Sequence, residues 1–221
     1  MTWKNNSEVI TMENKNNKKN KTPTVKKEEY AVILDYLSRG YVKSDMSKFG
    51  GKAIAQAIGT EQFTLLELAP KTGVDLDIQD TVYIGKGKRD KIYRVLGKLD
   101  YENLTATARI ELDYAIRDIV EANEDKFVEF FNTADSVSTR MHSLELIPGI
   151  GKKYMWDIIK AREEKPFESF EDITKRLPTL TDPAGMIVNR VKQELDTSIV
   201  RRGKRKYYLF TQAPRRPRNS K

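Results

Sequence analysis

The stretch LELIPGIGKKYMWDIIKAREEKPF, residues 144–167, decides how the C-terminal half of the chain folds. Leu144 and Ile147 are three positions apart, as on one face of a helix, and Pro148 cannot continue that helix. Apolar residues return at helical spacing from Met155 onward. The pattern therefore predicts a helix, a four-residue turn and a second helix.

The predicted turn contains Gly149, Ile150 and Gly151. Glycine permits positive φ, and because it has no Cβ it lets another backbone approach closely. Ile150 has no polar group to offer a ligand, so we expect it to pack into the core between the two helices. The second helix is expected to run to Arg162.

Two lysines, Lys152 and Lys153, open the second helix, and no acidic residue follows before Asp157. A helix N-terminus carries a partial positive charge, so acidic residues are favoured there and lysines are not. The amides of the turn, the helix dipole and the two ammonium groups converge, which predicts an anion site with phosphate as the expected ligand. The alternative is an ordinary αα-hairpin whose lysines are simply solvated.

The spacing from Leu144 to Gly151, followed by an apolar helix, resembles the helix-hairpin-helix motif of proteins that bind nucleic acids without sequence specificity. One position departs from that pattern, because Met155 stands where such motifs usually have a small residue. The resemblance implies contact with the phosphate backbone through the turn.

Residues 167–195 read as a degenerate second copy of the motif. Ser169 and Asp172 form a capping-box pattern for a short helix, and Asp182 with Pro183 starts another helix. The connection between these two helices lacks the two glycines, so we interpret this copy as scaffold. The apolar stripe of its second helix comprises Ile187, Val188, Val191 and Leu195.

The N-terminal half has a different pattern. The runs YAVILDYL, FTLLELAP, DTVYIGK and IYRVLGKL are rich in β-branched and aromatic residues and are bounded by turn residues, which predicts four strands. The segment GGKAIAQAIG, residues 50–59, is interpreted as a short helix closed by Gly59. A small β-barrel of the oligonucleotide/oligosaccharide-binding (OB) kind fits this order.

A basic loop, GKGKRDK, joins two of the predicted strands. It carries Lys86, Lys88, Arg89 and Lys91 against one acid, Asp90. Two glycines and four cations in a hairpin suit a nucleic-acid backbone. The alternative is a solvated turn with ordinary glycine chemistry.

Residues 104–134 have helical periodicity and are expected to connect the barrel to the hairpin region. Their phenylalanines at helical spacing are expected to be core residues rather than a base-stacking platform. Near the C-terminus, RKYYLFT, residues 205–211, is interpreted as a strand that pairs onto a sheet.

The positive charge is concentrated in two tails. Residues 1–28 hold seven basic and three acidic side chains, and residues 201–221 hold nine basic and no acidic ones. Since the whole chain carries +8, the body between them is mildly acidic. The tails are expected to be disordered, and they either neutralise phosphates or serve only as solubilising appendages.

The rest of the composition excludes several classes of site. There is no cysteine, hence no disulfide or thiolate metal site, and the single histidine, His142, cannot build a metal cluster alone. No apolar run approaches the about 20 residues of a membrane span, and the N-terminus lacks an apolar signal region. We expect a soluble cytoplasmic protein without a cofactor and without a membrane partner.

The order of six blocks is similar to an uncharacterised archaeal family catalogued as a domain of unknown function, family six-five-five of that catalogue. The blocks, which span residues 30–211, are YAVILDYL, FTLLELAP, VYIGKGKRDKI, FVEFFNTA, RMHSLELIPGIGKK and PFESFEDI. The resemblance implies an OB-like N-terminal domain, a helix-hairpin-helix C-terminal domain and a nucleic-acid-binding role. It also implies a link to translation or ribosome maturation, with ribosome-associated proteins as partners, and supplies no catalytic residue.

The sequence therefore predicts an α+β chain with a small OB-like β-barrel followed by an all-α helix-hairpin-helix domain. The expected divisions are a basic arm (1–28), the barrel (29–100), a helical connector (101–135), the hairpin domain (136–200) and a strand-like segment with a basic tail (201–221).

The expected function is non-enzymatic binding of nucleic acid, with RNA favoured over DNA. Two alternatives stay open. One is an assembly adaptor that binds a protein partner. The other is a nucleic-acid-processing enzyme, for which Asp75, Asp77 and Asp80 are a weak magnesium cluster and read more simply as a polar turn.

Overall fold

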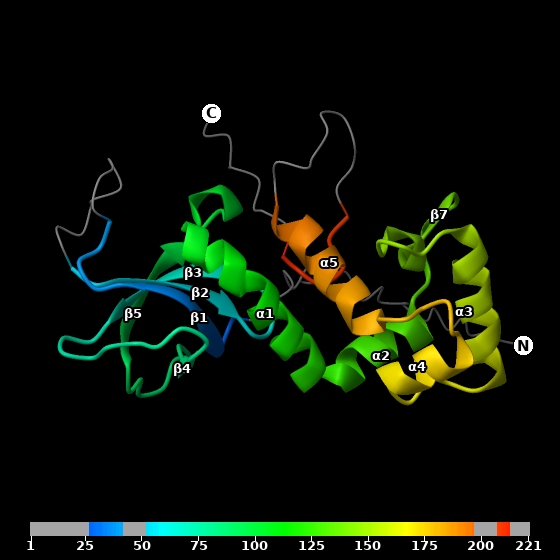
Figure 1. The fold of residues 1–221 in the computed structure, drawn as a ribbon, viewed down its shortest axis with the longest axis horizontal. Helices are drawn as coiled ribbons and strands as arrows, with labels where there is room; N and C mark the ends of the chain where they lie inside the picture. The colour runs from blue at the N-terminus through cyan, green and yellow to red at the C-terminus, as the bar shows by residue number, and fades with distance from the viewer. Residues whose placement is uncertain (1–26, 42–51, 197–206, 213–221) are drawn as a thin grey trace, which may run out of the picture.

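The computed structural model describes residues 27–41, 52–196 and 207–212 (Figure 1). The predicted basic arm (1–28) and the C-terminal segment (201–221) lie outside these residues except for residues 27, 28 and 207–212. An antiparallel five-stranded sheet occupies one end of the molecule and a group of short helices the other, with the helix α1 between them (Figure 1). No helix of the described residues is long and apolar enough to cross a membrane.

The sheet is a curled half-barrel with the strand order β4-β1-β2-β3-β5. The four predicted strand runs are confirmed, and the bounds of the strands are β1 Tyr30–Leu37, β2 Ile54–Gly59, β3 Leu65–Pro70, β4 Thr81–Tyr83 and β5 Ile92–Lys98. Irregular pairing bends the sheet at three places, one in the β1–β2 pair and two in the β3–β5 pair.

The prediction of a helix over residues 50–59 is wrong, because residues 54–59 form β2, the central strand. All six residues of β2 are buried, with β1 and β3 hydrogen-bonded on either side. Alanine favours helix locally, but a strand buried on both faces also uses small residues and shows no alternation. Tertiary pairing therefore overrides the local preference.

The two faces of the sheet are buried in different ways. The inner face of the half-barrel encloses its own apolar cluster, which includes Ile33, Ala57 and Leu68. The other face contributes Val32, Leu34 and other residues to a larger core that continues through the helices. The half-barrel and the helical end therefore share one continuous core.

Helix α1 (Ala106–Ala122) begins at the cap Thr105, whose side chain accepts a hydrogen bond from the Ala108 amide. It is separated from α2 (Glu124–Thr133) by Asn123, whose side-chain amide donates to the Ile119 carbonyl. The expected helical connector is therefore two helices. The phenylalanines are core residues as predicted, with Phe127 and Phe131 fully buried.

The first helix of the predicted hairpin is only one 3-10 turn, η2 (Ser143–Leu146). A short 3-10 turn, η1 (Tyr101–Asn103), precedes α1, and a small hairpin of β6 (Ser136–Ser138) and β7 (Met141–His142) precedes η2. The chain has no room for a longer helix here, because β7 ends at His142 on one side and Pro148 stops the helix on the other. The second helix forms as predicted, as α3 (Lys152–Glu164).

The two helices of the predicted second copy are confirmed as α4 (Phe170–Arg176) and α5 (Pro183–Leu195). Ser169 and Asp182 cap them by accepting from the amides of Asp172 and Gly185. The apolar stripe of α5 faces the shared core.

The predicted strand over residues 205–211 is wrong for residues 207–211, which form no strand and bend at 209–211, and residues 205 and 206 lie outside the described residues. The reason is that the carboxylate of Glu194 on α5 accepts from the amides of Leu209, Phe210 and Thr211. Those amides are therefore not available for a sheet.

Candidate nucleic-acid interface

The turn before α3 contains the positive φ angle that glycine permits. Only one of its two glycines adopts this angle. Gly149 has φ +90°, in the region that side-chain-bearing residues rarely adopt. Gly151 has φ −88° and serves as the N-cap of α3. Ile150 is 4 % exposed and packs in the shared core, as predicted.

The N-terminus of α3 presents amides that nothing in the described chain accepts. No side chain caps it, and its first turn contains no acid. The amides of Gly151, Lys152 and Lys153 have no hydrogen-bond acceptor among the described residues. Lys152 and Lys153 are exposed and form no ion pair with any residue that the structure describes.

Helices α4 and α5 differ from α3 in this respect. Side chains cap both of these helices: the Phe170 amide donates to Glu124, and the amides of Asp172 and Gly185 donate to the caps Ser169 and Asp182. Of these three helices, α3 is the one with no side-chain cap among the described residues, and its free amides lie beside unpaired cations, which is the chemistry that a phosphate oxygen requires.

A buried ion pair on α5 holds the turn in place. Arg190 donates from Nε to Glu194 at 2.8 Å and from a terminal nitrogen to the Leu146 carbonyl at 3.0 Å, just before the turn. Its other terminal nitrogen reaches the Tyr207 carbonyl, so α5, η2 and the C-terminal segment meet at one arginine. Glu194 is 3 % exposed, and this pair is a structural anchor rather than a ligand site.

His142 caps the 3-10 turn from the other side. Its Nδ1 accepts from the Leu144 amide at 3.1 Å, while Glu145 accepts from the His142 amide at 3.0 Å. Burial, together with the nearby charge of Arg162, lowers the pKa of His142. The histidine is therefore a buried capping residue of this turn.

The basic loop between β4 and β5 uses two of its four cations internally. Arg89 donates from Nε to the Gly85 carbonyl at 2.9 Å, and Lys91 pairs with Asp80 at 2.5 Å. Lys86 and Lys88 are exposed and have no ion pair within the described residues. The loop therefore offers two free cations where the sequence suggested four.

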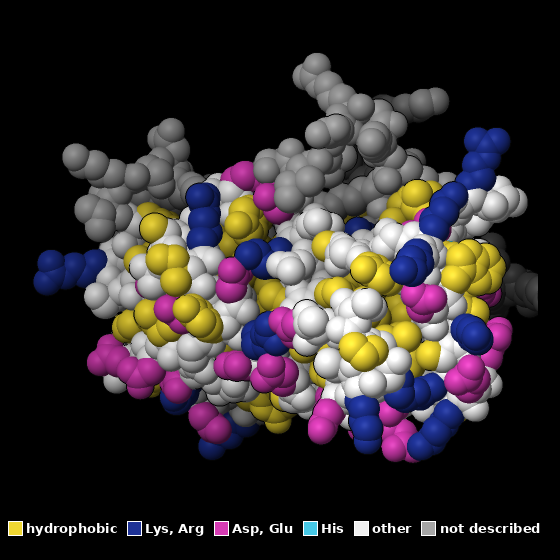
Figure 2. All heavy atoms as spheres, turned by 45° about the vertical axis from the view of Figure 1, so that its right-hand side comes forward, with side chains coloured by type: hydrophobic (Ala, Val, Ile, Leu, Met, Phe, Trp, Pro, Cys, Tyr) yellow, Lys and Arg dark blue, Asp and Glu magenta, His cyan; other side chains and the backbone are white. Residues whose placement is uncertain are grey.

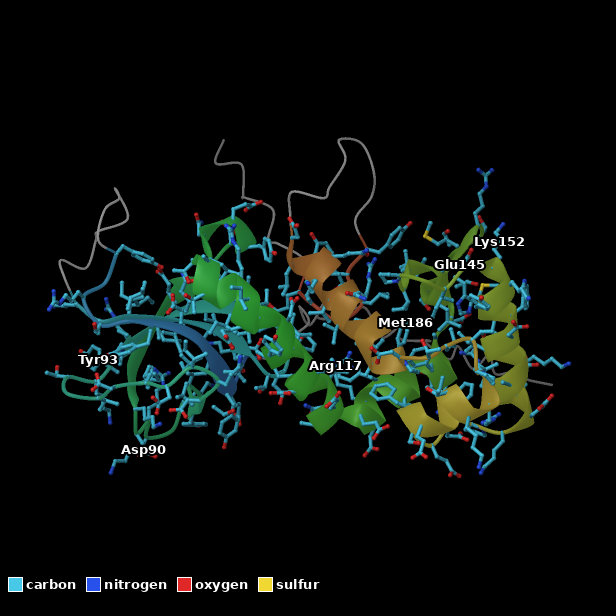
Figure 3. All side chains as sticks on the ribbon, in the orientation of Figure 1. Asp90, Tyr93, Arg117, Glu145, Lys152 and Met186 are labelled. Atoms are coloured by element: carbon cyan, nitrogen blue, oxygen red, sulfur yellow. The ribbon has the colours of Figure 1, made fainter. Side chains whose placement is uncertain are left out.

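The two predicted contact sites lie at opposite ends of the molecule. Figure 3 shows Asp90 of the basic loop at the lower left and Lys152 at the upper right. Lysine and arginine side chains on the face drawn in Figure 2 are interspersed with acidic ones and do not form a continuous basic surface. The turn and the loop are therefore separate local sites.

One further candidate residue near the turn was missed from the sequence. Trp156 on α3 is 64 % exposed, one turn after Lys152, and the exposed Lys160 follows one turn later. The spacing of four, which places these side chains on one helical face, was the available signal.

Two of the three aspartates considered as a magnesium cluster have structural roles. Asp75 accepts from the Tyr36 hydroxyl at 3.1 Å, and Asp80 pairs with Lys91. Among the described residues there is no group of three or more acidic or histidine side chains that could hold a metal ion.

The protein is a mixed α/β chain in which a curled half-barrel is joined to a glycine turn and short helices. The family model "Protein of unknown function (DUF655)" matches residues 27–212, and the chain belongs to that family. The chain is 47 % identical over 194 residues to the uncharacterized protein MJ0038 of Methanocaldococcus jannaschii, covering 87 % of this chain and 83 % of that protein.

A solved structure has the same fold. The crystal structure of Af1531 from Archaeoglobus fulgidus, of the same family, superposes with a TM-score of 0.75 at 43 % identity, covering 84 % of this chain and all of that chain. The resemblance to an uncharacterised archaeal family is thereby confirmed.

Proposed function

We propose that the protein is a non-enzymatic nucleic-acid-binding protein of the cytoplasm, with RNA favoured over DNA, that contacts the phosphate backbone. In this proposal η2, the turn and α3 form a shortened helix-hairpin-helix, and the half-barrel is an OB-type barrel open between β4 and β5. The strand order supports the second assignment, since OB barrels are five-stranded and partly open.

The N-terminus of α3 is the observation that carries the proposal. Amides without an acceptor, an uncapped helix dipole and two unpaired lysines meet at a turn fixed by Gly149 and Ile150. A phosphate oxygen satisfies all of these groups together. Because such contacts carry no base information, binding should depend little on sequence.

The test is a mobility-shift comparison of duplex DNA, single strands and structured RNA. The variant Lys152→Glu/Lys153→Glu should weaken binding to the preferred ligand by about an order of magnitude or more, since two attractive charges become repulsive. Lys175→Glu is the matched control, because Lys175 is an exposed lysine of α4 in the second copy. Equal affinity of both variants and the wild type would remove the turn as the contact surface.

A second candidate function is an assembly adaptor for ribosome-associated proteins. Ile110 and Tyr114 lie one turn apart on α1 and are 63 % and 62 % exposed. The segment with the half-exposed Ile78 lies beside them, because its neighbour Gln79 donates to Glu111. Clustered exposed apolar side chains favour a protein partner.

The adaptor function is tested by co-sedimentation with ribosomal subunits. If it holds, Ile110→Glu/Tyr114→Glu should abolish co-sedimentation, whereas Lys152→Glu/Lys153→Glu should not. Loss only in the lysine variant would favour direct binding to RNA.

A further inference from the structure

A groove of about 810 Å³ crosses the ends of the strands in the half-barrel. It is walled by the start of β2, the end of β3 and the start of β5, and on the other side by residues 71–75, which follow β3. Its charged and aromatic lining consists of Tyr36, Lys52, Lys71, Asp75, Tyr93 and Arg94.

Tyr93 projects from the rim of this groove. It is 70 % exposed, and Figure 3 shows it at the far end of the half-barrel. The pairing of β3 with β5 skips it, because Ala69 pairs with Arg94 and Pro70 with Ile92. The irregularity holds the ring away from both apolar cores, and the ring has no hydrogen bond or ring contact with the residues that the structure describes.

The groove is lined by more basic than acidic described residues. Lys52 and Lys71 line it, and the acid among its described lining residues, Asp75, accepts a hydrogen bond from the Tyr36 hydroxyl. Gly73 lies in the wall with φ +78°, and the space where a Cβ would stand is open, so a ligand can approach the backbone there.

The groove is joined to the basic loop. The Lys71 ammonium donates to the Arg89 carbonyl at 2.5 Å, and the Lys71 amide donates to the Lys91 carbonyl at 2.9 Å. The free lysines of the loop, Lys86 and Lys88, therefore belong to the same end of the molecule as the groove.

We propose that this groove binds single-stranded nucleic acid, with Tyr93 stacking on a base and Lys52 and Lys71 contacting the backbone. This inference rests on the proposed nucleic-acid-binding function. It specifies which class of nucleic acid binds at the half-barrel. Proteins that bind single strands without sequence preference combine a positively charged groove with aromatic rings on which bases stack. In a duplex the bases are stacked on each other and cannot lie on Tyr93.

Fluorescence anisotropy with the full chain tests the proposal, using labelled twelve-nucleotide oligouridine and oligothymidine and a duplex of equal length. Tyr93→Ala should weaken binding of the single strands roughly fivefold or more, and Tyr93→Phe, which keeps the ring, should bind as the wild type does. Both variants should bind the duplex unchanged.

The outcomes separate this proposal from the function on which it rests. If Tyr93→Ala binds single strands as tightly as the wild type while Lys152→Glu/Lys153→Glu does not, the groove proposal is overturned and the turn stands. If the wild type binds none of the three ligands, both proposals fall. If polyglutamate displaces the labelled single strand as efficiently as unlabelled oligouridine does, the groove recognises negative charge alone. That result would overturn the proposed stacking on Tyr93.

Photocrosslinking gives a test that needs no variant. An oligonucleotide with 5-iodouridine, irradiated in complex with the protein and mapped by mass spectrometry, should crosslink to the peptide that contains Tyr93. Crosslinks confined to Trp156 or to other peptides would overturn the assignment.

Discussion

The two ends of the molecule present positive charge in different ways. At the helical end, main-chain amides and two lysines are fixed by a glycine with φ +90° and by the buried Ile150. At the half-barrel end, the charge lies on side chains: Lys86 and Lys88 are exposed without an ion pair among the described residues, and the groove adds Lys52 and Lys71.

This difference has a consequence for binding. Amides held by the backbone lose little entropy when they bind and are only weakly affected by salt, whereas exposed lysines depend on charge that salt screens. We therefore expect the amides of the turn to retain affinity at high salt, whereas Lys152, Lys153 and the cations of the half-barrel end set the salt dependence.

The largest effect is expected from the anchor of the helical end. Glu194→Ala leaves the buried Arg190 without its charge partner and frees residues 209–211, so the free energy of unfolding should fall by about 3–5 kcal/mol. Urea denaturation measures it. Lys165→Ala, which breaks the exposed pair with Glu168, is the control and should leave the unfolding curve unchanged. If the two variants unfold alike, the pair does not anchor the turn.

The next effect separates the two glycines of the turn. Gly149→Ala should destabilise by about 1–3 kcal/mol, because alanine is strained at φ +90° although no atom blocks it. Gly151→Ala should be nearly neutral, since its φ is −88° and the space around it is open. Thermal unfolding of both variants checks this, and equal destabilisation would show that the turn is not held by Gly149.

A smaller effect is expected in the salt dependence at the half-barrel end. Lys86→Ala/Lys88→Ala should reduce the slope of log affinity against log salt on duplex DNA by up to about 1.8, at about 0.9 for each lost phosphate contact. Lys91→Ala should leave the slope unchanged, because that lysine is paired with Asp80. If Lys91→Ala lowers the slope and Lys86→Ala/Lys88→Ala does not, Lys91 leaves Asp80 to bind the ligand.

The smallest effect concerns pH. The pKa of His142 is lowered by burial and by Arg162, so between that lowered pKa and the ordinary value of 6.5 the unfolded state binds more protons than the folded state. Stability should therefore fall as the pH drops through this window. His142→Asn should flatten the curve there, since it is the one histidine of the chain. A wild-type curve with no slope near pH 6 would contradict this.

Helices, strands and turns were predicted correctly from the sequence where the local residue pattern agreed with the way the segment is buried in the fold. The caps Ser169 and Asp182, the glycine turn and four strands were found because each depends on neighbours within a few residues. β2 was missed because its alanines favour helix locally while its partners lie on β1 and β3.

The candidate site was less predictable, because it depends on side chains that meet across the chain. Arg89 and Lys91 looked free in the sequence, yet one closes its own loop and the other pairs with Asp80. Residues 207–211 have a strand-like composition, but the carboxylate of Glu194 takes three of their amides. A single sequence does not show which distant acid will accept those bonds.

The most direct test of the account is a titration followed by the backbone amide signals of the ¹⁵N-labelled protein. On addition of the tightest-binding oligonucleotide, the amides of Gly151, Lys152 and Lys153 should show the largest shifts at the helical end. The amides of Phe170 and Asp172 should stay in place, since they are already bonded to Glu124 and Ser169. A complex that forms while the three α3 amides do not move would contradict phosphate binding at the turn.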